Sequence, residues 1–173
     1  MPALRFPVAV IIERVPLVNR WASERWGVAG VEPGDDPPAP PVKLDADGAR
    51  ERWRFAGHAI ELHRSEAEGY FLNVSAPDPK VFVMWRAIEE SPAPDGEPKI
   101  RPQLVTVSYN EAARLLDGGE QVDAVPLPPD IRDWMQPFIA EHYRPEPKRK
   151  SKRNEFYERE AAAGEAMPER RNR

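Results

Sequence analysis

The chain has 173 residues, of which 40% are hydrophobic, and its 25 basic and 29 acidic side chains leave a formal net charge of −4. This length suits one compact domain with appendages. The negative net charge excludes a chain that binds polyanions through its overall charge. The absence of cysteine excludes disulfides, thiolate metal ligands and a cysteine nucleophile, and the 21 prolines, more than twice the usual share of roughly 5%, exclude a helical bundle or coiled coil.

The N-terminal part of the chain has the pattern of two strands. Residues 4–15 contain a continuous run of β-branched side chains, which is typical of a strand buried on both faces. Residues 21–31 form a second candidate strand. Residues 33–41 then carry five prolines, one glycine and two aspartates and predict a loop, because proline removes hydrogen-bond donors while glycine and aspartate favour turns.

The middle of the chain has the pattern of an antiparallel meander. Between residues 50 and 87, apolar side chains alternate with polar ones, and turns recur at intervals of about ten residues. Within this stretch, Tyr70, Leu72 and Val74 fall on one face of a predicted strand at residues 70–75. Residues 103–107 give one more strand.

Helices follow the strands. Ser108 with Glu111 three residues later is a capping-box signature, and the apolar run after it ends at Gly118. Pro129 suits the first turn of a second helix. We therefore predict an α+β fold: a curled antiparallel sheet of about five to seven strands, shaped like a half-barrel or a sandwich, with two C-terminal helices.

Charge divides the chain into two parts. Residues 144–173 hold ten basic and six acidic side chains, whereas residues 1–143 hold fifteen and twenty-three. The C-terminal part also has too little apolar surface to offset the chain entropy lost on folding. We expect a single α+β domain at residues 1–143 and a basic, largely disordered tail at residues 144–173.

No targeting segment or membrane span is expected. The first apolar run covers only residues 8–12, whereas a secretory signal has a longer apolar region and a membrane span needs about 20 apolar residues. We expect a cytoplasmic protein.

No catalytic constellation stands out. The sequence lacks a Gly-x-Ser-x-Gly elbow, a Walker loop and a Gly-x-Gly-x-x-Gly fingerprint. His58 and His63 are five residues apart on a predicted strand, so they point to opposite faces. We expect no catalytic residue, no metal site and no cofactor. The alternative is an enzyme or small-ligand binder with a pocket inside the curled sheet, for which His58, His63 and Glu61 are the first candidates.

Two groups of residues predict binding to a protein partner. Trp21 and Trp26 flank a polar bend beside Arg14 and Arg25, and tryptophan and arginine are favoured anchors in protein interfaces. The second group creates a positive field in the tail: Lys148, Arg149, Lys150, Lys152 and Arg153. A nucleic acid is the less favoured partner, because the acidic domain would repel a polyanion and the tail has few aromatic side chains for base stacking.

Three segments together resemble a known family. They are residues 10–21 with Trp26 following, residues 61–64 with the run 70–74, and residues 122–143 with Trp134, followed by the basic run. With these segments the chain resembles the small proteobacterial proteins catalogued as domain of unknown function 3305, over nearly its whole length to about Arg153. The genes of that family tend to lie beside formate dehydrogenase genes and their accessory factors.

The resemblance implies a role but no catalytic residue. It implies a non-catalytic accessory protein that assists assembly or maturation of a molybdenum-dependent formate dehydrogenase through protein–protein contacts. The expected partner is the formate dehydrogenase or one of its maturation factors.

Overall fold

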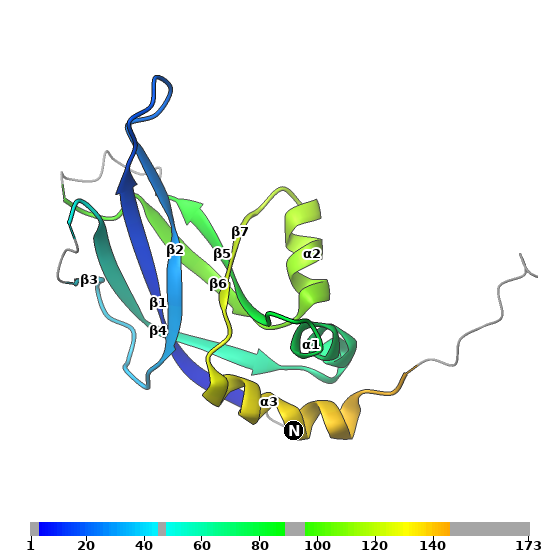
Figure 1. The fold of residues 1–173 in the computed structure, drawn as a ribbon. Coiled ribbons are helices and arrows are strands. Elements are labelled where there is room, and N and C mark those ends of the chain that lie inside the picture. The colour runs from blue at the N-terminus through cyan, green and yellow to red at the C-terminus, as the bar shows by residue number, and fades with distance from the viewer. Residues whose placement is uncertain (1–3, 45–47, 89–95, 146–173) are drawn as a thin grey trace, which may run out of the picture.

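The computed structural model describes residues 4–44, 48–88 and 96–145 (Figure 1). These residues form seven strands: β1 (Leu4–Pro16), β2 (Glu24–Pro33), β3 (Val42–Lys43), β4 (Glu51–Leu62), β5 (Lys80–Ala87), β6 (Ile100–Thr106) and β7 (Gln121–Pro126). They also form a short 3-10 turn, η1 (Arg64–Glu66), and three helices: α1 (Ala67–Val74), α2 (Tyr109–Asp117) and α3 (Pro129–His142). The predicted α+β class and the two C-terminal helices are confirmed. The predicted tail lies outside the described residues from position 146 onward.

The strands form two separate sheets, so the prediction of one curled sheet is wrong. The first sheet has the order β2-β1-β4-β3 and the second the order β6-β5-β7, and every pairing is antiparallel. The chain leaves β4 for η1 and α1 before it enters β5. This helical crossing interrupts the meander, and β5 pairs with β6 and β7 instead of β4.

The segment predicted as a strand at residues 70–75 belongs mainly to helix α1, which is the second correction. Its buried residues include Tyr70, Asn73 and Val74, at the three- and four-residue spacing of one helix face. The Asn73 amide donates to the carbonyls of Lys80 and Val107, and its oxygen accepts from the Lys80 amide. These bonds tie α1 to the start of β5 and to the residue that follows β6.

Both later helices begin as the sequence predicts. Ser108 is the N-cap of α2, and its hydroxyl accepts from the Glu111 amide at 3.1 Å. Beyond the end of α2, Gly119 adopts a positive φ of 85°, a conformation that glycine favours. Pro129 opens α3, where its missing N–H is one that no helical carbonyl would accept.

Both sheets and α3 share one hydrophobic core. Phe6 of β1 meets Trp134 of α3 edge-on at 5.2 Å, and Tyr70 of α1 meets Phe138 of α3 at 5.9 Å. The core includes Val8, Val10, Ile12, Trp53 and Phe55 of the first sheet, Val81, Val83, Val105 and Val125 of the second, and Ile131, Met135 and Phe138 of α3. No helix in the described ranges has the length and apolar character needed to cross a bilayer.

Candidate partner-binding arm

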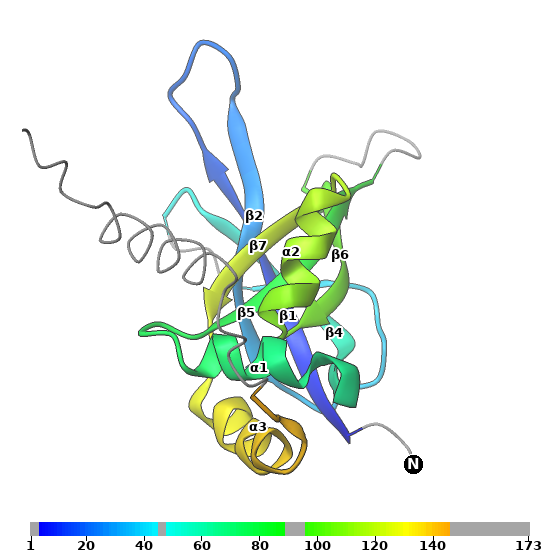
Figure 2. The same ribbon diagram turned by 90° about the vertical axis from the view of Figure 1, so that its right-hand side faces the viewer.

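The hairpin formed by β1 and β2 extends beyond the other described elements in both views (Figures 1 and 2). Its ladder runs from the pair Val8 and Pro33 to the pair Pro16 and Glu24. We call residues 14–25 the arm and residues 17–23 its tip. The Leu17 amide donates to the Ser23 carbonyl at 2.9 Å and closes the tip.

The tip presents two apolar side chains to solvent. Trp21 is 89% exposed, and Val18 is fully exposed. The Asn19 side chain accepts from the Trp21 amide at 3.0 Å, which fixes the backbone of the turn beneath the indole. Because most tryptophans bury the larger part of their surface, this exposure marks the tip as a candidate contact surface.

Trp26 lies at the root of the arm, which is the level of Arg14, Glu24 and Trp26, and it contributes to packing instead of to the exposed surface. Its ring packs on that of Trp53 with centroids 5.2 Å apart, and its indole nitrogen donates to Glu24 at 3.1 Å. The side chain is half-buried against the core. Trp21 and Trp26 therefore do not form one patch, since the first is exposed at the tip and the second belongs to the packing beneath the arm.

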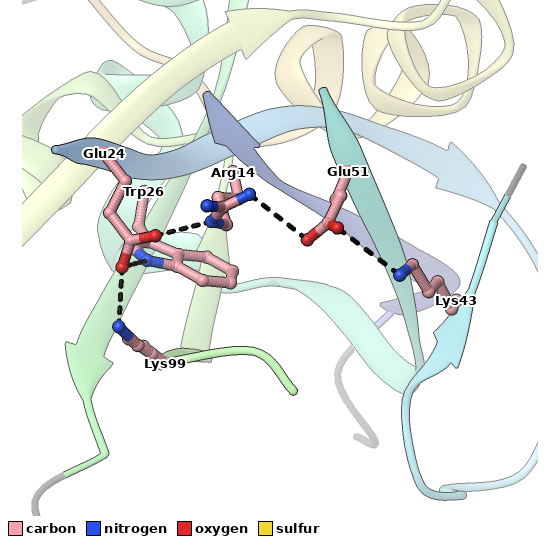
Figure 3. Close-up of polar contacts among 6 residues, drawn as sticks. All are labelled: Arg14, Glu24, Trp26, Lys43, Glu51 and Lys99. Atoms are coloured by element: carbon pink, nitrogen blue, oxygen red, sulfur yellow. Dashed lines mark hydrogen bonds and ion pairs between the residues drawn. The ribbon is translucent and has the colours of Figure 1, made fainter. Parts of the chain in front are cut away.

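Glu24 is the centre of a polar network at this root (Figure 3). Arg14 donates to one of its carboxylate oxygens at 2.5 Å, and Lys99 donates to the other at 2.7 Å. Hydrogen bonds from Lys99, Arg14 and Trp26, in that order of effect, lower the pKa of Glu24 to about 2. Lys99 directly precedes β6, so the network connects the arm to the second sheet.

The same network crosses the first sheet. Strand pairing places Arg14 opposite Trp26 on one side and opposite Glu51 on the other. Arg14 approaches Glu51 at 3.5 Å, and Glu51 approaches Lys43 of β3 at 3.5 Å. A hollow of about 250 Å³ lies among these charges, lined also by Gly96 and Glu97. Since its cations and anions pair with each other, the arrangement suits a structural clamp better than a ligand site.

The structure separates the predicted partner-binding residues. Arg14 and Trp26 meet at the root, Trp21 occupies the tip, and Arg25 is exposed and points to the opposite face of β2 from Trp26. The basic residues Lys148, Arg149, Lys150, Lys152 and Arg153 lie outside the described residues.

Sequence reasoning missed four members of this region: Val18, Glu24, Glu51 and Lys99. Glu24 could have been found, because it lies two residues before Trp26 on the same face of a strand. Lys99 carried no local signal, since 75 residues separate it from Glu24.

The residues considered for a ligand pocket do not converge. His63 lies 3.7 Å from Glu61, and both side chains are about half exposed. His58 lies apart from them and lines a second hollow of about 250 Å³, separate from the one at the root of the arm. Arg5, Asp35 and Asp36 also line this hollow. Burial lowers the pKa of His58, which favours the neutral imidazole. Within the described residues, no group of three or more histidine and carboxylate side chains is placed to hold a metal ion.

A larger hollow of about 560 Å³ lies at one end of the second sheet. Arg86 and Arg101 lie opposite each other there on β5 and β6. Arg86 donates to both oxygens of Glu120, at 2.6 and 3.2 Å. This hollow is an open, charged groove rather than the enclosed apolar pocket typical of small-ligand sites.

A cluster of titratable side chains also lies where η1 meets α2. Ser108 donates to Glu66 at 2.5 Å, and Glu66 pairs with Arg114. Burial, and then the charge of Glu66, raise the pKa of Glu111. Ser108 is fully buried with its hydroxyl engaged as both donor and acceptor, so it serves the fold as a helix cap.

Fold and arm define the class of this protein: an α+β domain of two antiparallel sheets and three described helices, with a projecting hairpin that exposes a tryptophan. Residues 7–152 match the family described as protein of unknown function, DUF3305, and the chain belongs to that family. No curated protein and no solved structure matches the chain.

Proposed function

We propose that this chain is a non-catalytic accessory protein that assists assembly or maturation of a molybdenum-dependent formate dehydrogenase through protein–protein contacts in the cytoplasm. The observation that carries the protein-binding part is Trp21, which is 89% exposed at the tip of the arm. The formate dehydrogenase part rests on the gene neighbourhoods of the DUF3305 family, to which the chain belongs.

The energetics favour a contact surface at the tip. Burying a tryptophan removes about 150–250 Å² from water, and each Å² of apolar surface contributes about 25 cal/mol. A partner that encloses Trp21 therefore gains roughly 4–6 kcal/mol before the loss of side-chain and rigid-body freedom. The ion pairs of Glu24 with Arg14 and Lys99 tie the root of the arm to the segment that enters the second sheet, which reduces the freedom that binding would remove.

A deletion strain tests this function. Cells that lack the gene should lose formate dehydrogenase activity, and the wild-type gene should restore it. Trp21→Ser should fail to restore the activity, because it removes the apolar anchor. Leu116→Ser is the matched control, since Leu116 is also exposed, at 55%, but lies on α2. Normal formate dehydrogenase activity in the deletion strain contradicts the proposal.

A further inference from the structure

We infer that the tip docks into an apolar pocket rimmed by carboxylates on the surface of a partner protein. Trp21 and Val18 enter the pocket, and Arg20 and Arg25 pair with the rim. This inference rests on the proposed function in one respect, that the partner is a protein, and it adds the chemistry of the surface that the partner presents.

The side chains of the tip are the reason to expect an apolar pocket. Val18 and Trp21 are exposed within the same seven-residue turn. Two hydrogen bonds hold that turn, one from Leu17 to Ser23 and one from the Trp21 amide to Asn19. A large rigid side chain on an ordered turn loses little conformational freedom when it binds, which is a property of interface anchors.

The charge of the arm indicates what surrounds the pocket. Residues 14–25 contain three arginines and a single carboxylate, that of Glu24. Glu24 is held by Arg14, Lys99 and Trp26 at the root. Arg20 and Arg25 are exposed, and no ion pair to either is present among the described residues. Arg20 at the tip and Arg25 near the root therefore give the arm cationic side chains that complement carboxylates around the pocket.

The charge of the rest of the domain favours a protein over a polyanion. Residues 1–143 carry a net charge of −8 although they include the basic arm. An anionic membrane or a nucleic acid presents negative charge over a wide area, and it would repel this body as the tip approached. A local acidic rim on a protein attracts the arm without repelling the rest of the acidic domain.

Site-specific photo-crosslinking in the full-length protein tests the inference. The photoreactive amino acid p-benzoylphenylalanine replaces Trp21 in one variant and Leu116 in a control variant, and living cells are irradiated. We expect position 21 to crosslink a protein segment that contains apolar residues and two or more acidic ones. Position 116 should give no such product, because Leu116 lies on α2 and not on the arm.

Charge reversal supplies a second measurement. Arg20→Glu combined with Arg25→Glu should lower the crosslinking yield from position 21 by about tenfold, because like charges would then face each other at the rim. The matched control is Arg132→Glu, an exposed position on α3, which should leave the yield unchanged.

Several results overturn the inference. They are crosslinks from position 21 to lipid, to nucleic acid or to a second copy of this chain, crosslinks to a protein segment without acidic residues, and the absence of any crosslink. The identity of the partner is a separate outcome. An acidic, apolar segment on a protein unrelated to formate dehydrogenase contradicts the proposed function and leaves the docking chemistry standing.

Discussion

The side chain of Asp123 on β7 accepts a hydrogen bond from the backbone amide of Val28 on β2, at 2.9 Å. A strand of the second sheet thus provides an acceptor for a backbone donor on the edge of the first sheet. Gly27 lies beside this contact, and a Cβ atom there would lie 3.0 Å from the same carboxylate oxygen. The two sheets are therefore joined by a side chain as well as by their core.

Asp123→Ala should lower the free energy of unfolding by about 1–3 kcal/mol, because it leaves the Val28 amide without its acceptor. Gly27→Ala should also destabilise the domain, since its added methyl group displaces the carboxylate. Urea denaturation followed by circular dichroism measures both changes. Asp133→Ala, at an exposed position of α3, is the control and should change the stability by less than about 0.5 kcal/mol. Equal effects of Asp123→Ala and Asp133→Ala would contradict the proposed role of the contact.

The Glu24 network predicts a specific loss of stability in acid. The pKa of Glu24 is lowered to about 2, chiefly by the hydrogen bond from Lys99. An acid whose pKa falls on folding stabilises the folded state above its unfolded pKa, near 4.5, and this contribution disappears as the pH falls through the folded pKa.

Glu24→Gln should therefore lower the free energy of unfolding by about 1–3 kcal/mol at pH 7. The difference from wild type should shrink as the pH falls from about 5 toward about 2. Denaturant titrations across this pH range measure it. Glu141→Gln, at a side chain 73% exposed, should show little effect at any pH. A difference between wild type and Glu24→Gln that does not change with pH would show that the carboxylate charge is not the cause.

Trp21 of the arm and Trp26 at its root should respond differently to the same substitution. Trp21→Ser should leave the stability within about 0.5 kcal/mol of wild type, because the indole is in solvent. Trp26→Ser should cost about 2–3 kcal/mol, because it removes the packing on Trp53 and a donor to Glu24. Thermal or urea unfolding separates these outcomes, and a large destabilisation by Trp21→Ser would show that the indole packs against the domain.

The basic tail should act on the rate of association. Because the described residues end at Pro145, a chain stopped there tests the contribution of Lys148 and the basic residues that follow. We expect association with purified formate dehydrogenase subunits to slow by about tenfold at low salt, and the difference to vanish at high salt. Surface-based binding kinetics at several ionic strengths measure the effect. Equal rates for both chains at low salt would contradict a steering role.

The fold could be predicted where its signals are local. The apolar run of β1 and the Ser108 capping box each identify an element from a few neighbouring residues. Residues 70–74 were misassigned because a run of large side chains fits both a strand and a helix. What stabilises the helix there is not local, since Asn73 bonds to Lys80 and to Val107, which lies 34 residues away.

The candidate site was predictable only in part. Trp21 and its neighbouring arginines could be identified from their composition, but the division between tip and root could not. That division depends on the Trp53 ring beneath Trp26 and on Lys99 arriving from the second sheet. Both contacts join segments far apart in the chain, and a single sequence carries no periodicity that pairs them.

A long hairpin that exposes a tryptophan also carries a risk of self-association. The unpaired backbone groups along its edge strand could form hydrogen bonds with a second copy of the chain. Asp123 counters this hazard where β2 passes β7, since a carboxylate already occupies an amide that an incoming strand would need. The excess of negative charge on the domain adds mutual repulsion between copies. An incoming strand therefore cannot pair with the Val28 amide of β2, whereas Trp21 at the tip stays exposed for a contact.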